Sequence, residues 1–109
     1  MEPALEGPGD QLTLQQLTDA MNAFVTSVGR YEPGSPRVQS PRNIAISLSL
    51  EAAEVLEHYQ WGEGADSAAL SEELADVMLY LLQLAYLTGI DLGDAVREKL
   101  VANYQRFGT

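Results

Sequence analysis

Four acidic residues occur as two pairs with the same spacing. Glu51 and Glu54 stand three residues apart in "EAAEVLEHYQW", and Glu73 and Asp76 stand three residues apart in "EELADVMLYLL". Three residues make nearly one turn of an α-helix, so each pair would lie on one side of its helix. Carboxylate oxygens are the ligands that Mg²⁺ and Mn²⁺ prefer. Two such pairs on facing helices would therefore suit a divalent ion that holds phosphate groups.

The residues around the two pairs are apolar, which makes unpaired carboxylates costly. Glu51 falls in line with Ile44 and Val55, and the second pair belongs to a helix that is apolar nearly all round. Burying an isolated carboxylate costs several kcal/mol or more, and neighbouring carboxylates repel one another. Three solutions remain open: the acids reach solvent as ordinary surface residues, they pair with cations from elsewhere, or they bind a metal ion.

The charges are segregated along the chain, whose formal net charge is -10. Ten acids and no Lys or Arg occur from residue 43 to residue 96. All six cations flank this acidic middle: Arg30, Arg37, Arg42, Arg97, Lys99 and Arg106. Nucleic acid binding is disfavoured because it needs a basic face. An acidic centre suits hard cations, and an acidic coat that favours solubility is the alternative.

The hydrophobic spacing predicts four helices and no strand, over about residues 13–29, 40–60, 66–89 and 91–107. The predicted starts are residues that cap helices, namely Thr13, Ser40, Asp66 or Ser67, and Asp91, and Gly89 is the predicted end of the third helix. At 109 residues the chain is expected to form one helical domain, residues 11–109, after a flexible tail, residues 1–10.

The predicted fold class is all-α, a four-helix-type bundle completed by oligomerisation. The third helix, residues 66–89, carries more apolar surface than two or three short neighbours can cover. Self-association as a homodimer or homotetramer would cover the remainder.

Composition also bears on the compartment. No stretch reaches about 18 consecutive apolar residues, so no membrane span is expected, and the first ten residues lack the pattern of a signal peptide. The chain has no Cys, which removes disulfides, thiolate catalysis and Cys-type zinc sites. A cytoplasmic location is the expectation.

The two acidic pairs and their surroundings resemble a known family. The pattern Glu51-x-x-Glu54, followed after eighteen residues by Glu73-x-x-Asp76, resembles the signature of MazG-like nucleotide pyrophosphohydrolases, the all-α NTP pyrophosphatases. The stretches "SPRN", "HYQW", "EELADVMLYLLQLA" and "KLVANYQRF" are similar to the branch that contains dCTP pyrophosphatases. Together they cover about residues 40–107.

The resemblance implies an activity and roles for individual residues. Members hydrolyse a nucleoside triphosphate between the α and β phosphates, to the monophosphate and pyrophosphate. The resemblance assigns Mg²⁺ (or Mn²⁺) binding and catalysis to Glu51, Glu54, Glu73 and Asp76. It assigns substrate contacts to Trp61 and Tyr80 at the base or sugar, and to Lys99, Asn103 and Arg106 at the phosphates. Without the resemblance, Trp61 would be a core aromatic residue, and the last three would be a solvated helix end.

The chain departs from the family pattern in ways that bear on the preferred base. Leu50 stands where broader members often carry an additional acid, and the loop "GSPRVQS" lacks a Trp and a His of the dCTP-type enzymes. We expect Tyr31 to supply an aromatic contact there and Asn22 to stand near the place of another expected His. His58 is expected beside the acids rather than as a ligand, since hard cations prefer oxygen.

Several functions therefore stay open. The first expectation is removal of non-standard or surplus nucleotides with a dCTP-like pyrimidine substrate. A preference for dUTP or a modified nucleotide is the alternative within this class. A non-catalytic helical oligomerisation module is the alternative from a different class. A di-iron bundle would need Glu-x-x-His pairs, which neither helix has.

Overall fold

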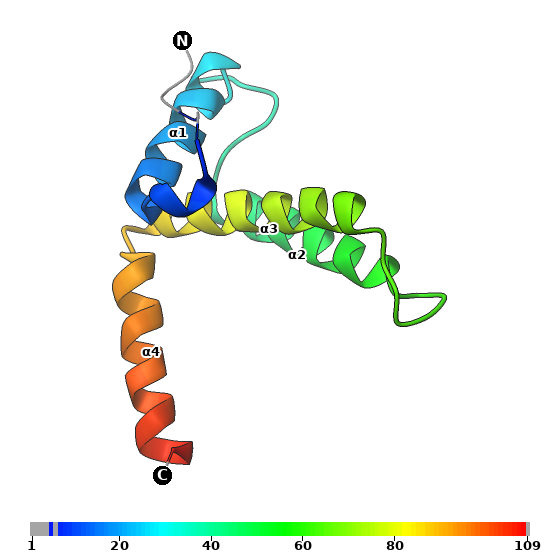
Figure 1. Ribbon diagram of the computed structural model, residues 1–109. Coiled ribbons are helices and arrows are strands. Elements are labelled where there is room, and N and C mark those ends of the chain that lie inside the picture. The colour runs from blue at the N-terminus through cyan, green and yellow to red at the C-terminus, as the bar shows by residue number, and fades with distance from the viewer. Residues whose placement is uncertain (1–4, 6, 109) are drawn as a thin grey trace.

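The described part of the chain contains four α-helices (Figure 1). The computed structural model describes residue 5 and residues 7–108. A short 3₁₀ turn, Gly9–Gln11, precedes α1 (Leu14–Ser27), α2 (Pro41–Glu57), α3 (Ser67–Thr88) and α4 (Leu92–Phe107). The described residues contain no strand, so the all-α class is confirmed. The predicted tail, residues 1–10, lies partly outside the described residues, and the boundary at residue 11 stays a prediction.

Predicted caps form at the N-termini of α1 and α2 and at the C-terminus of α3. The Thr13 hydroxyl accepts a hydrogen bond from the Gln16 backbone N–H at 3.0 Å, and the Gln16 side chain accepts one from the Thr13 N–H at 2.8 Å. Ser40 caps α2 by accepting from the Asn43 N–H at 3.2 Å. Gly89 ends α3 in the left-handed conformation (φ 70°), which glycine adopts at little cost. These local signals fix where three of the helices begin or end.

Two predicted details differ from the structure. The prediction extends α2 to about Gln60, but the helix ends at Glu57 because the next residues close turns with bonds to the third residue back, such as Gln60 N–H to the Glu57 carbonyl at 3.3 Å. Asp66 occupies the capping position of α3 but makes no capping hydrogen bond with its side chain. Both differences lie in the loop that joins α2 and α3.

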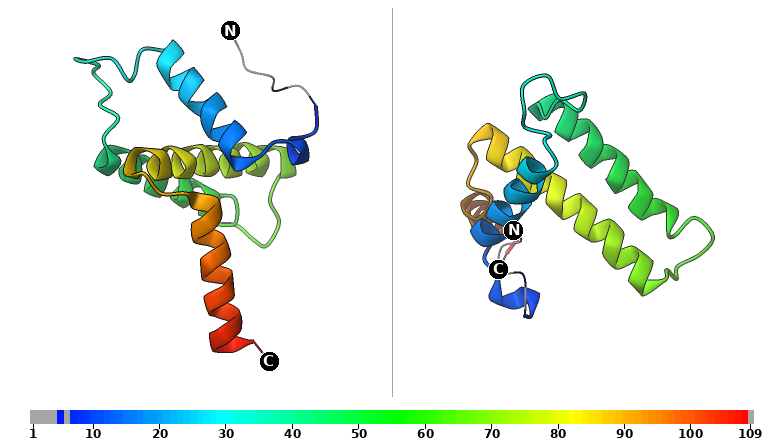
Figure 2. Two further views of the ribbon diagram at one scale, coloured as in Figure 1. Left: turned by 90° about the vertical axis from the view of Figure 1, so that its left-hand side faces the viewer. Right: turned by 90° about the horizontal axis from the view of Figure 1, so that it is seen from above.

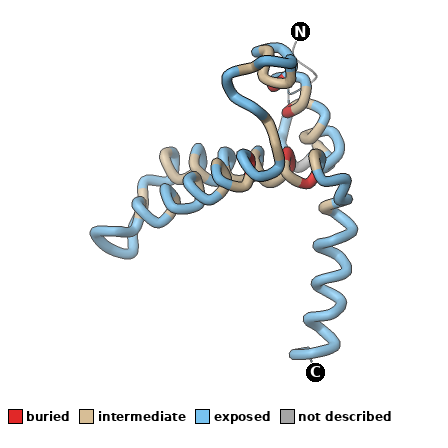
Figure 3. The backbone as a smooth tube through the Cα atoms, turned by 180° about the vertical axis from the view of Figure 1, so that it is seen from behind, coloured by how far each residue is buried: buried red, intermediate tan, exposed pale blue. Residues whose placement is uncertain are grey.

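Helices α2 and α3 form an antiparallel hairpin, and α1 packs across the C-terminal half of α3 (Figure 2). The buried core lies where these three helices meet (Figure 3). It consists of Met21 and Val25 from α1, Ile44 from α2, and Leu82 and Ala85 from α3. The distal half of the hairpin therefore has no third helix over it within one chain.

Helix α4 points away from the other three helices, with a bend of 100° between α3 and α4 (Figure 1). Only its first turn lies near α1, beside Leu14. None of its residues is buried, and its apolar side chains are exposed by half or more at Leu100, Tyr104 and Phe107. Three helices, rather than four, pack together within the single chain.

Helix α3 was expected to be enclosed on most sides, and in the single chain it is not. Its buried residues are Leu82, Gln83 and Ala85, while Leu74 and Leu79 are about half exposed. The reason is that α4 leaves the bundle and only α1 and α2 cover α3.

Among the described residues, no single helix is long and apolar enough to cross a membrane; α3 and α4 pass that test only as a bent pair.

Candidate metal centre

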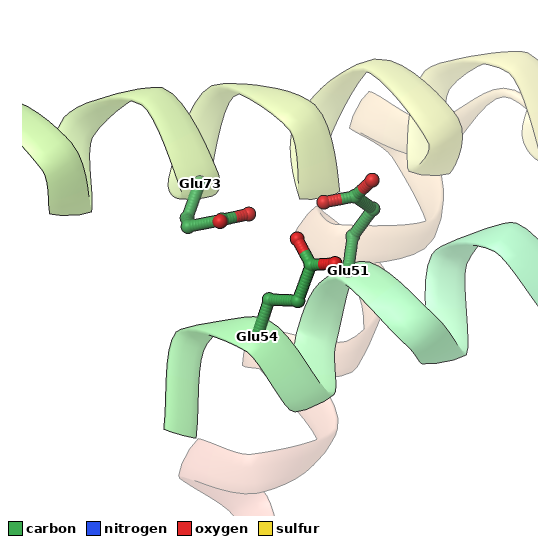
Figure 4. A group of neighbouring side chains, drawn as sticks. All are labelled: Glu51, Glu54 and Glu73. Carbon is green, nitrogen blue, oxygen red and sulfur yellow. The ribbon is translucent and has the colours of Figure 1, made fainter. Parts of the chain in front are cut away.

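The hairpin brings three carboxylates together (Figure 4). Glu51 and Glu54 project from successive turns of α2, and Glu73 projects toward them from α3. One oxygen of each lies within 4.8 Å of the others. The Glu-x-x-Glu spacing places two acids on the side of α2 that faces α3, and the antiparallel pairing of the helices supplies the third.

Two oxygens of this carboxylate group lack a partner. Oε2 of Glu51 and Oε2 of Glu73 are buried and accept no hydrogen bond, whereas Glu54 is exposed. Burial, together with the neighbouring carboxylates of Glu73, Glu54 and Asp76, raises the pKa of Glu51 from 4.5 to about 7, and burial makes the largest contribution. Buried polar atoms are normally satisfied, so this arrangement stores an unfavourable free energy.

A divalent cation fits these residues. The donors are hard carboxylate oxygens from three side chains, and the two buried oxygens without partners would gain a cation as their missing partner. Nε2 of His58 lies 3.9 Å from Oε1 of Glu73, which is beyond a hydrogen bond. The described residues place no Lys or Arg within 4.0 Å of these carboxylates. The carboxylate group can therefore hold a divalent cation.

Asp76, the fourth predicted ligand, stands apart from the carboxylate group. It is exposed, it lies one turn beyond Glu73 on α3, and it is not among the acids whose oxygens lie within 4.8 Å of one another. Its charge nevertheless contributes to the raised pKa of Glu51. The structure thus brings together three of the four predicted ligands, and ligation by Asp76 stays a prediction.

A cavity of about 400 Å³ opens beside the carboxylates, between α1 and α3. Glu51 and Asp76 line one part of it, and Tyr80 lines it as well, which places this predicted substrate residue next to the acids. Most of the other lining residues are apolar: Leu5, Leu17, Ala20, Met21, Phe24, Val25 and Leu79. The cavity, called here the α1–α3 cavity, has the size and character of a pocket for a small organic group.

The remaining predicted substrate residues are not brought to the α1–α3 cavity. Trp61 is 92% exposed in the loop between α2 and α3. Lys99, Asn103 and Arg106 are exposed on α4, which projects away from the hairpin (Figure 1). Within one chain these residues do not line the α1–α3 cavity, so their roles stay predictions.

Tyr31, a predicted substrate residue that does not line the α1–α3 cavity, contacts Asn22, which was expected near the place of a His of the dCTP-type enzymes. The Tyr31 hydroxyl donates to Oδ1 of Asn22 at 2.5 Å and accepts from Nε2 of Gln83 at 3.3 Å. Burial raises the pKa of the Tyr31 hydroxyl above its ordinary value.

Two polar residues of the α1–α3 cavity, Gln83 and Arg30, were not predicted from the sequence. The signal for Gln83 was present, since it is an amide within the otherwise apolar run "YLLQLAYL". Arg30 carried no such signal, because it sits at the start of a loop whose path the sequence does not determine.

The raised pKa of Glu51 predicts how stability depends on pH in the absence of metal. Between pH 4.5 and about 7 the folded protein holds a proton that the unfolded chain has lost. The free energy of unfolding should therefore fall as the pH rises through this range, and the contribution of Glu51 should be constant outside it. Urea unfolding in EDTA across this range measures the slope. Glu51→Gln should reduce the slope, and an equal slope in this variant would contradict the assignment.

Comparisons with known proteins show which chains this one resembles. Residues 46–109 match the MazG-like family model. The chain is 39% identical to dCTP pyrophosphatase 1 from Rattus norvegicus over 77 residues, which cover 62% of this chain and 45% of that protein. The human dCTP pyrophosphatase 1 gives the same identity and coverage. The chain thus spans less than half the length of the curated relatives it matches.

A solved structure extends the likeness to the whole fold. The crystal structure of a pyrophosphatase from Archaeoglobus fulgidus superimposes with a TM-score of 0.71 at 28% sequence identity, covering 98% of this chain and 100% of that one. The family match includes more than half of the chain and contains all four predicted acidic residues. This chain therefore belongs to the MazG-like family.

Proposed function

We propose that the protein is a Mg²⁺-dependent nucleoside triphosphate pyrophosphohydrolase. It would cleave a (d)NTP between the α and β phosphates and release the monophosphate and pyrophosphate. The observation that carries this proposal is the carboxylate group of Glu51, Glu54 and Glu73, in which two buried oxygens have no partner. Membership of the MazG-like family and the likeness to proteins named pyrophosphatase support it.

Metal binding and proton transfer are assigned to particular acidic residues of the chain. Glu51, Glu54 and Glu73, with Asp76 as a further ligand, would hold Mg²⁺ or Mn²⁺. Bound there, the ion would neutralise phosphate charge and polarise the scissile linkage. Glu54 is the exposed member of the carboxylate group, so water can reach it, and we assign to it the proton of the attacking water. The water oxygen forms a bond to the α phosphorus while the bond from that phosphorus to the α–β bridging oxygen breaks, and pyrophosphate leaves.

The nucleoside would occupy the α1–α3 cavity. Tyr80 lines this cavity beside Asp76 and can stack on a base, while the apolar residues of α1 exclude water. A dCTP-like pyrimidine is the first candidate, in line with the relatives named dCTP pyrophosphatase 1. dUTP or a modified nucleotide is the second. The proposed task is removal of surplus or non-standard nucleotides from the cytoplasmic pool.

The active assembly is proposed to be a homodimer or homotetramer. Apolar residues of α4 such as Leu100 and Tyr104 are exposed within one chain, as are Leu74 and Leu79 of α3. A second copy would cover these surfaces. The same contact would let Lys99, Asn103 and Arg106 of one copy approach the phosphates bound by another.

A panel of deoxynucleoside and nucleoside triphosphates, incubated with the purified protein and Mg²⁺, tests the proposal. The expected products are the monophosphate and pyrophosphate, detected by chromatography and by a phosphate assay that responds only after pyrophosphatase is added. Direct release of orthophosphate would contradict the proposed cleavage site. No turnover of any nucleotide would favour the non-catalytic oligomerisation module.

A further inference from the structure

Gln83 is a polar residue buried in the core, with 3% of its surface exposed. It lies on α3 and lines the α1–α3 cavity among apolar neighbours such as Met21, Val25 and Leu79. A polar side chain in such a place is costly unless its hydrogen-bonding groups are used. The hydrogen-bond partners of the Gln83 amide therefore indicate the role of this residue.

Neighbouring residues fix the orientation of this amide. Nε2 of Gln39 donates to the Arg37 carbonyl at 2.8 Å, so the oxygen of Gln39 is the atom left to face Gln83, and Nε2 of Gln83 donates to it at 2.8 Å. The Tyr31 hydroxyl gives its proton to Asn22, so its oxygen accepts from Nε2 of Gln83 at 3.3 Å. Both contacts require the NH₂ group of Gln83 on the side of the loop.

The carbonyl oxygen of Gln83 therefore takes part in neither of these two hydrogen bonds. It accepts no hydrogen bond from any of the described residues, and it is not among the side-chain atoms that are fully buried without a partner. The opening next to Gln83 is the α1–α3 cavity. The wall of this mostly apolar pocket thus carries a hydrogen-bond acceptor, and the Gln83 amide cannot present a donor there without breaking two hydrogen bonds.

The position of Gln83 along α3 relates it to the carboxylates. It follows Asp76 by seven residues, so the two lie on the same face about 10 Å apart along the helix axis, with Tyr80 between them. A triphosphate held at the carboxylates would extend its nucleoside along this face. The base edge would then arrive at Gln83.

We propose that the carbonyl oxygen of Gln83 accepts a hydrogen bond from the exocyclic amino group of the substrate base, and so selects amino-bearing bases. Cytosine presents N–H donors where uracil presents an oxygen acceptor. Because the orientation of the Gln83 amide is fixed, the oxygen of uracil would face the Gln83 carbonyl oxygen. Both atoms are acceptors, so neither would have a hydrogen-bond partner. This inference rests on the proposed nucleotide hydrolysis and assigns its base selectivity to one residue.

Competition between dCTP and dUTP in one tube measures that selectivity. The ratio of the two kcat/KM values does not depend on how much enzyme is folded, because both substrates meet the same molecules. Wild type should prefer dCTP, and Gln83→Met should reduce the ratio about tenfold, the value of one hydrogen bond in a pocket. Gln15→Met, a matched change at an exposed glutamine of α1, should leave the ratio unchanged.

A second variant keeps Gln83 and releases its orientation. Tyr31→Phe combined with Gln39→Met removes both acceptors of the NH₂ group, so the amide can turn over and present a donor to uracil. The ratio of kcat/KM for dCTP to kcat/KM for dUTP should fall in this double variant toward the value for Gln83→Met. If Gln83→Met does not fold, the double variant tests the proposal in its place.

The outcomes separate the two proposals. An unchanged ratio in a folded Gln83→Met, or a wild type that prefers dUTP, overturns the role of Gln83 while nucleotide hydrolysis stands. A wild type that hydrolyses neither nucleotide overturns the proposed function, and the role of Gln83 falls with it.

Discussion

Replacing Glu54 with Gln should lower kcat/KM for the preferred nucleotide by about a thousandfold or more. Glu54 lies in the carboxylate group with Glu51 and Glu73, and it is the member that solvent reaches. Glutamine keeps the size of the side chain but has neither the charge that would hold Mg²⁺ nor a site for the proton. Steady-state assays with a saturating Mg²⁺ concentration measure the loss.

The fold should survive this change, because Glu54 is exposed and removal of one carboxylate relieves repulsion at Glu51. Circular dichroism and thermal unfolding check this point. Glu72→Gln is the matched control, since Glu72 is an exposed acid of α3 outside the carboxylate group. Turnover of Glu54→Gln at the wild-type rate would show that the acids do not serve catalysis.

Placing charges on the apolar side of α4 should abolish both assembly and activity. Leu100 and Tyr104 lie four residues apart on α4 and expose 53% and 76% of their surfaces within one chain. Leu100→Asp with Tyr104→Asp would bury two unpaired carboxylates in the proposed contact, at a cost of several kcal/mol. Light scattering should show monomers, and kcat/KM should fall by about a hundredfold or more as Lys99 and Arg106 lose their neighbouring site.

Gln105→Asp provides the control, because it adds one charge at an exposed polar position of the same helix. Assembly and turnover should both persist in this variant. If wild type is itself monomeric and active, or if the double variant stays active as a monomer, the proposed sharing of sites between copies is wrong.

The sequence predicted the parts of the fold that depend on neighbouring residues. Thr13 with Gln16, Ser40 with Asn43, and Gly89 act within a few residues of themselves, so their capping roles could be inferred from spacing alone. The direction of α4 could not be inferred in this way. Its bend of 100° from α3 depends on the short connection after Gly89 and on which surface covers its apolar side.

The same distinction between local and long-range contacts applies to the site. The spacing of Glu51 and Glu54 on one turn, and the acid pair on the next helix, predicted the carboxylate group before any contact was known. It did not predict that Asp76 lies outside this group, because the register of α2 against α3 sets which turn faces the acids. The use of Gln83 depends on Gln39 and Tyr31, which lie 44 and 52 residues away in the chain.

A crystal structure with Mn²⁺ would show whether a divalent ion is held between α2 and α3. Anomalous scattering at the manganese edge locates the ion without reference to the activity. We expect a peak within about 2.5 Å of oxygens from Glu51, Glu54 and Glu73. Side chains turned apart into solvent, with no peak between the two helices at saturating Mn²⁺, would contradict it.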